Sequence, residues 1–243
     1  TKRSIYSKGR IMIHFNADWK NIGISLSGGA DSALLAYLVC SQIKDTKVHI
    51  LSHVRMWKTR PWQRYDSIRV FEWLQQRFPN IEFVRHENFI PPDLEYGDKG
   101  AYIEDEYGQI RSGDQIIVRA HAEWIAVTHN LNAWYAGKTK NPSDPTITKG
   151  MPDRDIIVED PNELVKDHKG VAVCHPFLYT EKDEIIAQYV SHNILDLLNI
   201  TRSCEGDFAD IDYTTYTPNQ IVPECGECFW CQERNWAKEK NNV

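Results

Sequence analysis

Two short segments of the chain combine residue types whose spacing suits chemistry. The first, Ser27-Gly28-Gly29-Ala30-Asp31-Ser32, follows one apolar run and precedes another. Adjacent glycines let the backbone turn tightly and present successive N–H groups, and a helix that begins there adds partial positive charge. We therefore predict a loop that binds an anion such as a phosphate, with hydroxyl donors from Ser27 and Ser32.

Asp31 lies at the expected start of that helix. A carboxylate at this position either caps free amides or holds a Mg²⁺ ion that shields a phosphate. The loop lacks the lysine of the GxxxxGK[ST] phosphate loop and also lacks the GxGxxG pattern of dinucleotide folds. The alternative interpretation is a well-capped turn between a strand and a helix, without a ligand.

The second segment is rich in cysteine. It reads Cys225-Gly226-Glu227-Cys228-Phe229-Trp230-Cys231, and Cys204 precedes it. Four close thiols in an intracellular chain hold a metal more often than they form disulfides. Four thiolates also complete the closed tetrahedral site of structural zinc, so Cys204, Cys225, Cys228 and Cys231 are the predicted Zn²⁺ ligands. Iron–sulfur ligation by the same four residues and free buried thiols are the alternatives.

Composition excludes several classes of protein. The chain has 243 residues, a net charge of −6, 42% hydrophobic residues and 26% charged residues, as in ordinary globular proteins and unlike disordered chains. Its acidic balance argues against a broad nucleic-acid-binding face. No apolar run approaches the roughly 20 residues of a membrane span, and no secretory signal is evident. We expect a cytoplasmic protein with no membrane association and no stable nucleic-acid partner.

The elements that position these segments follow from hydrophobic periodicity, which alternates strands with helices. Strands are expected at 21–26, 47–54, 81–86, 132–136 and 171–174, after a short apolar run at 11–15. Helices are expected at 31–43, 65–78, 115–130 and 180–198, the last with a break near 192–193. The alternation predicts an α/β fold with a mostly parallel five-stranded sheet and helices on both faces. Ligands of such sheets bind at the carboxyl ends of strands, where the 27–32 loop lies.

The domain organisation follows from the same reading. We expect an α/β domain over residues 1–200 and a small C-terminal zinc-binding segment over 201–243. The polar stretch 88–113 is too long for a simple connection and is expected to be an active-site loop or an insertion. Residues 138–170 form a second irregular stretch, and both could supply a lid over the site. Lys182 is expected to meet phosphates at the carboxyl edge of the sheet.

The sequence SGGADS resembles the SGGxDS pyrophosphate loop of the ATP pyrophosphatase (PP-loop) family. That family has a Rossmann-like fold of the adenine nucleotide alpha hydrolase type and cleaves ATP between its α and β phosphates to adenylate a substrate. The resemblance implies ATP and Mg²⁺ as cofactors. It assigns the phosphate-loop role to Ser27, Gly28, Gly29, Asp31 and Ser32, and we expect Ala30 to share it. We also expect nucleotide contacts from Gly137 and from the backbone of His53, and catalysis by Ser27, Asp31, Ser32 and Lys182.

Within that family, the chain resembles the 7-cyano-7-deazaguanine synthases of queuosine precursor (preQ0) biosynthesis. The resemblance rests on Thr201-Arg202-Ser203-Cys204, on the CGxCxxC segment that begins at Cys225, and on a lysine, Lys182, that opens a helix. It implies an ATP-dependent C–N ligase that converts a 7-deazaguanine carboxylate to an amide and then a nitrile with ammonia, as a homodimer. The expected deazapurine region departs from the family pattern, because Tyr65 follows Gln63-Arg64 where the family has histidine.

Two other functions fit the same motifs. One is a different PP-loop adenylating enzyme, acting in thiolation or amidation, whose cysteines are redox-active or hold an iron–sulfur cluster. The other is a zinc-containing module that binds a nucleotide without turnover.

Overall fold

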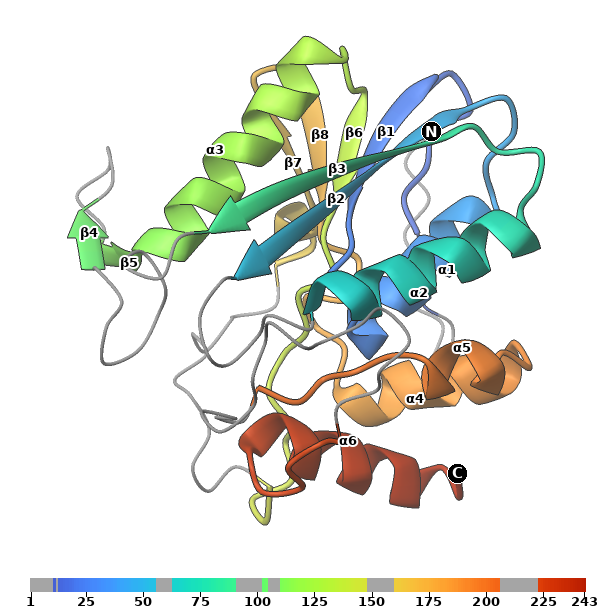
Figure 1. Cartoon of the computed structure of the whole chain (residues 1–243), viewed down its shortest axis with the longest axis vertical. Coiled ribbons are helices and arrows are strands. Elements are labelled where there is room, and N and C mark those ends of the chain that lie inside the picture. The colour runs from blue at the N-terminus through green and yellow to red at the C-terminus, as the bar shows by residue number, and fades with distance from the viewer. Residues whose placement is uncertain are drawn as a thin grey trace.

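A six-stranded sheet runs through the computed structural model, in the order β3-β2-β1-β6-β8-β7 (Figure 1). The structure describes residues 11, 13–55, 63–90, 102–104, 110–147, 160–205 and 223–243. The strands are β1 (Asn21–Ser25), β2 (Lys47–Arg55), β3 (Phe83–Ile90), β6 (Ala133–Tyr135), β7 (Val165–His168) and β8 (Val171–Cys174), with a separate hairpin of β4 (Tyr102–Glu104) and β5 (Ile110–Ser112). The helices are α1 (Ala30–Cys40), α2 (Gln63–Arg77), α3 (Gly113–Thr128), α4 (Lys182–Ser191), α5 (Leu195–Asn199) and α6 (Phe229–Lys240), with a 3₁₀ turn at Pro161–Leu164.

The sheet is parallel except at one edge. β1 pairs in parallel with β2 and β6, β2 with β3, and β6 with β8. The direction of the strand order reverses between β1 and β6, so the loops that leave these two strands meet at the switch point of a Rossmann-like sheet. This confirms the predicted mostly parallel α/β fold, with six strands in place of five.

The additional strand is β7, which pairs antiparallel with β8. Lys169 and Gly170 join the two strands, and both have positive φ, 54° and 84°. Two residues of positive φ form the tight turn whose twist suits a hairpin. The sequence prediction placed residues 165–168 in an irregular stretch because their polar side chains give no apolar alternation.

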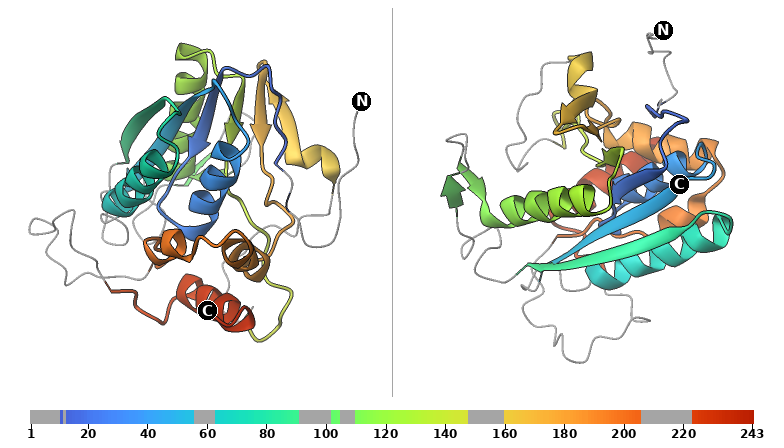
Figure 2. Two further views of the ribbon diagram at one scale, coloured as in Figure 1. Left: turned by 90° about the vertical axis from the view of Figure 1, so that its right-hand side faces the viewer. Right: turned by 90° about the horizontal axis from the view of Figure 1, so that it is seen from above.

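Helices cover both faces of the sheet (Figure 2). On β1, Ile22 and Ile24 are fully buried in the cluster that contains α1, α4 and α5. On β2, the strand next to β1, Leu51 belongs to a second cluster with Ala122 and Ile125 of α3. Because successive side chains of a strand point to opposite faces, the two clusters mark the two faces, with α1 on one and α3 on the other.

The helix boundaries follow local signals. α3 ends before Asn130, whose φ of 51° stops the helix, and the Leu131 N–H then donates to the Ala126 carbonyl. The expected break near 192–193 is present, since α4 ends at Ser191 and Asn193 has a φ of 54°. None of the helices in the described ranges is long and apolar enough to cross a membrane.

Two segments outside the predicted strands and helices pack against the buried core. The residues described at 11 and 13–15 form no strand; the side chain of Ile13 is buried, and the Tyr135 hydroxyl donates to the His14 carbonyl at 2.7 Å. The C-terminal segment contains a helix that was not predicted, α6, which lies beside α4 at the foot of the molecule (Figure 1). Trp236 and Ala237 of α6 belong to the same buried cluster as residues of β1 and α1. The expected boundary between an α/β domain and a C-terminal segment at residue 200 stays a prediction.

Candidate functional site

The predicted anion-binding loop joins the carboxyl end of β1 to the amino end of α1. Gly28 has a φ of 82°, a left-handed conformation that side chains rarely adopt. A Cβ atom there would lie 2.6 Å from the Ser67 amide nitrogen and 2.7 Å from Asp66. Glycine is therefore required both by the backbone conformation and by close packing against α2.

Hydroxyl groups hold the loop in shape. The Ser27 and Ser32 hydroxyl oxygens lie 3.0 Å apart, and the Ser27 amide donates to the Ser32 hydroxyl at 3.2 Å. The Ser32 hydroxyl in turn donates to the Gly29 carbonyl at 3.1 Å, and the Gly29 amide donates to the Ser27 hydroxyl at 3.3 Å. The two serines close a ring across the turn, so the loop is formed without a ligand.

The first turn of α1 is open to a ligand. Its N-cap is Gly29, which makes no side-chain capping hydrogen bond. The N–H groups of a helix's first turn have no partner within the helix and carry the positive end of its dipole. The buried carbonyl of Ala30 accepts a hydrogen bond from the Tyr189 hydroxyl at 2.6 Å, which fixes this turn to α4.

A buried lysine lies against the loop. The Lys182 ammonium donates to both carboxylate oxygens of Asp31, at 2.6 and 2.5 Å. It also lies 3.8 Å from the carboxylate of Glu233 on α6. The side chain of Lys182 is 4% exposed and that of Glu233 is 2% exposed, so the lysine is buried between two acidic groups.

The Thr201–Cys204 segment passes directly beside the loop. The Arg202 amide donates to the Gly28 carbonyl at 2.9 Å, and the Arg202 guanidinium donates to the Pro223 carbonyl at 2.7 Å. Asp66 is buried nearby and makes a close ion pair with Arg69. Burial raises the pKa of Asp66 to about 6, although Arg69 and Arg202 oppose the rise.

These parts enclose one polar pocket above the loop. Carboxylates, a lysine, an arginine and a thiol line it together with loop atoms. The lining residues are Ser27, Gly29, Asp31, Gln63, Asp66, Lys182, Arg202, Ser203, Cys204, Glu205, Trp230 and Glu233. The pocket therefore joins the predicted phosphate loop to the start of the cysteine segment.

Two other predicted nucleotide contacts lie apart from this lining. Gly137 follows β6, and a Cβ atom there would come within 3.2 Å of the Asp31 carbonyl carbon and the Ser32 amide. It therefore packs against the first turn of α1 at the switch point. The His53 ring faces α3, where its Nε2 lies 3.4 Å from Nδ1 of His121. The side chain of His53 does not line the loop pocket, and its contact with a nucleotide stays a prediction.

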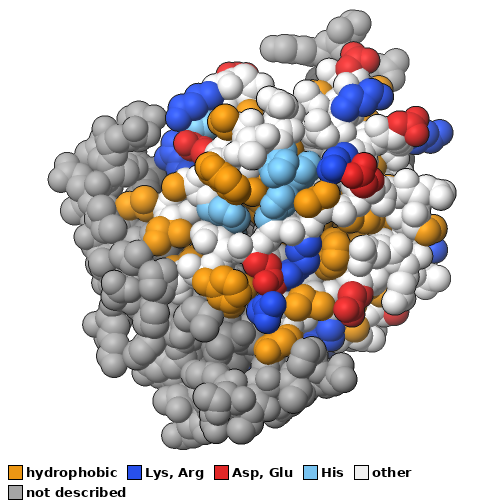
Figure 3. Space-filling view, turned by 45° about the horizontal axis from the view of Figure 1, so that its top comes forward, with side chains coloured by type: hydrophobic (Ala, Val, Ile, Leu, Met, Phe, Trp, Pro, Cys, Tyr) orange, Lys and Arg blue, Asp and Glu red, His pale blue; other side chains and the backbone are white. Residues whose placement is uncertain are grey.

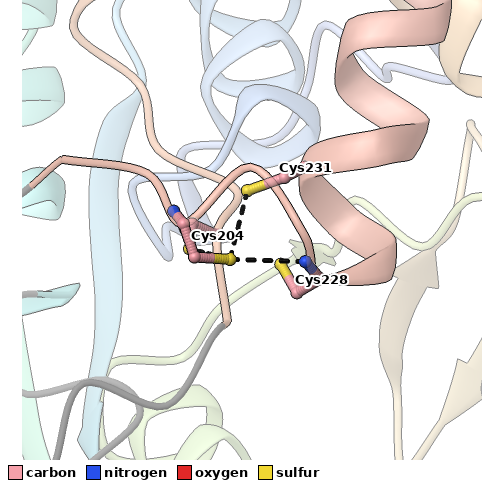
Figure 4. Close-up of side chains that lie close together, drawn as sticks. Cys204, Cys228 and Cys231 are labelled. Carbon is pink, nitrogen blue, oxygen red and sulfur yellow. Dashed lines mark hydrogen bonds between the residues drawn. The ribbon is translucent and has the colours of Figure 1, made fainter.

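The four predicted metal ligands converge at the amino end of α6. The four sulfur atoms of Cys204, Cys225, Cys228 and Cys231 all lie within 4.8 Å of one another. Figure 4 shows three of these side chains turned toward a common centre. The sulfur atoms of Cys204 and Cys225 lie 3.5 Å apart, and those of Cys225 and Cys231 lie 3.9 Å apart.

This geometry fits a single metal ion. Sulfurs bound at about 2.3 Å to one tetrahedral zinc ion lie about 3.8 Å apart. In an iron–sulfur cubane each thiolate binds a different iron, which separates the sulfurs further. Burial raises the pKa of the Cys231 thiol to about 12, whereas a hydrogen bond with Cys204 lowers the pKa of Cys228. A bound cation supplies the charge that deprotonates such thiols.

Sequence reasoning missed four groups of the pocket, Asp66, Glu205, Trp230 and Glu233. Trp230 and Glu233 lie on α6, whose apolar residues Phe229, Trp236 and Ala237 recur at helical spacing. That pattern was the available signal for the helix. Asp66 lies in the first turn of α2, and no sequence signal indicated that this turn packs against Gly28.

The sheet order, with a glycine turn at its switch point, defines a Rossmann-like α/β protein. Among solved structures, the chain is similar to the U34-tRNA thiolase NcsA from Methanococcus maripaludis with its [4Fe-4S] cluster, at 16% identity and a TM-score of 0.43, over 91% of this chain and 66% of that chain. It is also similar to NMN synthetase from Francisella tularensis, at 13% identity and a TM-score of 0.39, over 93% of this chain and 85% of that chain. The chain thus spans just under two thirds of the length of NcsA. No family model and no curated protein matches the chain.

Proposed function

We propose that the chain is an ATP-dependent adenylating enzyme that binds the pyrophosphate part of ATP on the 27–32 loop. One observation carries the proposal: the uncapped first turn of α1 opens into the pocket that also contains the buried ion pair of Lys182 and Asp31. A preformed loop, a helix amino end and a lysine together are suited to the charge of a polyphosphate.

The residues of the loop have distinct tasks in this reaction. An acceptor oxygen attacks the α phosphorus of ATP, the bond from that phosphorus to the bridging oxygen breaks, and pyrophosphate leaves. The backbone N–H groups at the start of α1 hold the leaving pyrophosphate, while Ser27 and Ser32 keep the loop in its binding shape. Lys182 is positioned to shield the negative charge that develops on the leaving group.

The carboxylates of the pocket suit Mg²⁺. Asp31, Asp66 and Glu233 line it, and carboxylate oxygens are the donors that Mg²⁺ prefers. When bound, the ion neutralises phosphate charge. The excess of acidic groups around Lys182 means that a polyphosphate without a cation would be repelled from this side of the pocket.

For the acceptor we propose the carboxylate of a 7-deazaguanine, as the resemblance of the two motifs implies. Adenylation gives an acyl adenylate, and ammonia displaces AMP to form an amide with release of a proton. A second ATP adenylates the amide oxygen with release of pyrophosphate, and loss of AMP and a proton leaves the nitrile. The cysteine site holds a Zn²⁺ ion, whose four thiolates leave no open position for substrate.

A second candidate function is adenylation for sulfur transfer. It is favoured by one observation, that Cys204 lines the same pocket as the loop. This function needs iron or a reactive thiol at the cysteines, whereas the first needs only a structural ion. Metal analysis of the purified protein separates the two: one zinc at the cysteine site supports the first, and oxygen-sensitive iron supports the second.

The test of adenylation uses an oxygen label. The protein is incubated with ATP, Mg²⁺, ammonium and 7-carboxy-7-deazaguanine that carries ¹⁸O in its carboxylate. We expect AMP and pyrophosphate, with one ¹⁸O atom transferred to AMP, because the carboxylate oxygen attacks the α phosphorus. Unlabelled AMP would show that water is the nucleophile, which contradicts the acceptor. Formation of ADP, or ATP binding without cleavage, would contradict adenylation itself.

A further inference from the structure

Three histidines from separate elements meet on the face of the sheet that carries α3. His49 lies on β2, His86 on β3, and His129 directly follows α3. One ring nitrogen from each lies within 4.8 Å of the others. Figure 3 shows histidine side chains gathered in a patch that reaches the surface on this side of the molecule.

The rings are arranged as a compact triad. Nδ1 of His49 and Nε2 of His86 lie 2.8 Å apart, and these two rings are stacked with centroids 5.1 Å apart. The ring of His129 packs against both, with centroids 4.5 Å from His49 and 4.9 Å from His86. Each pair of rings is thus in direct contact.

From this juxtaposition we infer that His49, His86 and His129 form a second metal site, which binds a zinc-type divalent ion through three imidazoles. Imidazole nitrogen is a preferred ligand of such ions. Two nitrogens bound to one tetrahedral ion lie about 3.3 Å apart, so small rotations of the rings close the site. His49 is 1% exposed whereas His86 and His129 are only partly buried, which leaves the fourth position to water.

The contacts within the triad agree with an ion. A hydrogen bond joins ring nitrogens of His49 and His86, and a cation bound by all three imidazoles would take its place.

The position of the triad indicates that an ion bound there would have a structural role. The cysteine site lies at the amino end of α6, whereas the triad ties the carboxyl end of α3 to β2 and the edge strand β3. β2 also leads from the triad to the carboxyl edge of the sheet, where the loop is. A bound ion would therefore fix α3 against the sheet without entering the loop pocket.

The test uses the full chain labelled with ¹⁵N in its histidine rings. Zn²⁺ is added and the ring nitrogens of all nine histidines are followed by NMR. We expect three histidines to move to metal-bound shifts and to saturate together, and the other six to stay where they are. Shifts that never saturate, or shifts spread over the surface histidines, would overturn the site. This readout is independent of the cysteines, which contain no imidazole.

Variants assign the three signals. His129→Asn is expected to weaken binding by at least tenfold, and to remove the zinc-dependent rise in melting temperature. The matched control is His121→Asn, which changes a histidine of α3 that lies outside the triad and contacts His53 and Trp124. Equal loss in both variants would overturn the assignment. If His129→Asn does not fold, the labelled wild-type chain alone decides the question.

Discussion

The ammonium of Lys182 lies 2.6 and 2.5 Å from the two carboxylate oxygens of Asp31, a residue 151 positions earlier in the chain. This ion pair joins the first residue of α4 to the first turn of α1, next to the 27–32 loop. With the buried Glu233 at 3.8 Å, one positive charge faces two negative ones. The charge of the lysine is therefore neutralised by its neighbours, and a polyphosphate at the proposed site would have to bring a cation or take Lys182 from Asp31.

The first prediction concerns Lys182. We expect Lys182→Met to lower the rate of AMP formation by about 100-fold, because a charge that stabilises the leaving group is lost. ATP affinity should fall as well, since Asp31 and Glu233 then repel phosphate without compensation. Steady-state release of AMP and pyrophosphate measures the first effect, and calorimetric titration with MgATP measures the second.

The matched control is Lys240→Met. Lys240 is exposed; it pairs with Asp183 at 3.1 Å, and its ammonium lies 4.2 Å from the centroid of the Trp236 ring. Exposed contacts of these kinds contribute at most about 1 kcal/mol each, so this variant should keep wild-type activity and most of its stability. A Lys182→Met protein that is folded and fully active would show that Lys182 only supports the structure.

The second prediction concerns the shape of the loop. Gly28 and Gly170 have nearly the same positive φ, 82° and 84°, but a Cβ atom meets α2 at Gly28 and meets nothing within 4 Å at Gly170. Alanine at Gly170 should therefore cost only the backbone strain, of about 1 kcal/mol. Alanine at Gly28 should cost at least about 2 kcal/mol more and abolish ATP binding, because the loop has to move away from Ser67.

Urea unfolding of both variants measures the difference. Comparing the two variants separates the free-energy cost of the positive-φ backbone, which both share, from the cost of the steric contact with α2, which only Gly28→Ala makes. Equal destabilisation of the two variants would mean that the loop adapts to the extra methyl group. ATP binding retained by Gly28→Ala would argue against this loop as the phosphate site.

Local patterns in the sequence were sufficient for the parts of the site that come from one continuous segment. The strand, the two glycines and the helix of residues 21–40 follow one another, so their relative position is fixed by short-range geometry. The CxxC spacing likewise brings Cys225, Cys228 and Cys231 together. Such features need no knowledge of the rest of the fold.

Features that depend on contacts between distant segments were not accessible in this way. Glu233 reaches Lys182 only because α6 packs against α4. The three histidines meet only because β2 and β3 are neighbouring strands and α3 packs on β3. The strand β7 is polar, so its sequence gives no signal of a strand. It forms a strand because it pairs with β8 in a hairpin. Pairwise contacts of this kind depend on register and crossing angle, which periodicity does not determine.

The third prediction concerns the cysteine site. Cys231→Ala should remove one metal ion per chain, measured by plasma mass spectrometry, and lower the melting temperature. The control is Cys174→Ala, a buried cysteine of β8 outside the cluster, for which we expect a packing loss of about 1 kcal/mol and no change in metal content. Because the site joins residues 204 and 225–231 beside the loop pocket, ATP binding should also weaken in Cys231→Ala. Equal metal content in the two variants would exclude Cys231 as a ligand.

The last prediction is a pH dependence that originates at Asp66. Its folded-state pKa of about 6 lies above the ordinary value of 3.8, because burial disfavours the charged carboxylate. The native state thus holds this proton more tightly than the unfolded state. The associated stability is fully present below pH 3.8 and is lost as the pH rises through 6.

Asp66→Asn removes a carboxyl group whose burial lowers the free energy of unfolding only when the group is charged. The difference in unfolding free energy between this variant and the wild type should therefore shift in favour of the variant as the pH rises from 4 to 7, by at most about 3 kcal/mol. Urea unfolding at each pH measures this difference. Asp45→Asn is the control: Asp45 is exposed and has a φ of 51°, a conformation that asparagine tolerates, so its difference should stay nearly constant. A constant difference for Asp66→Asn as well would mean that the ion pair of Asp66 with Arg69 already offsets the cost of burying the charge.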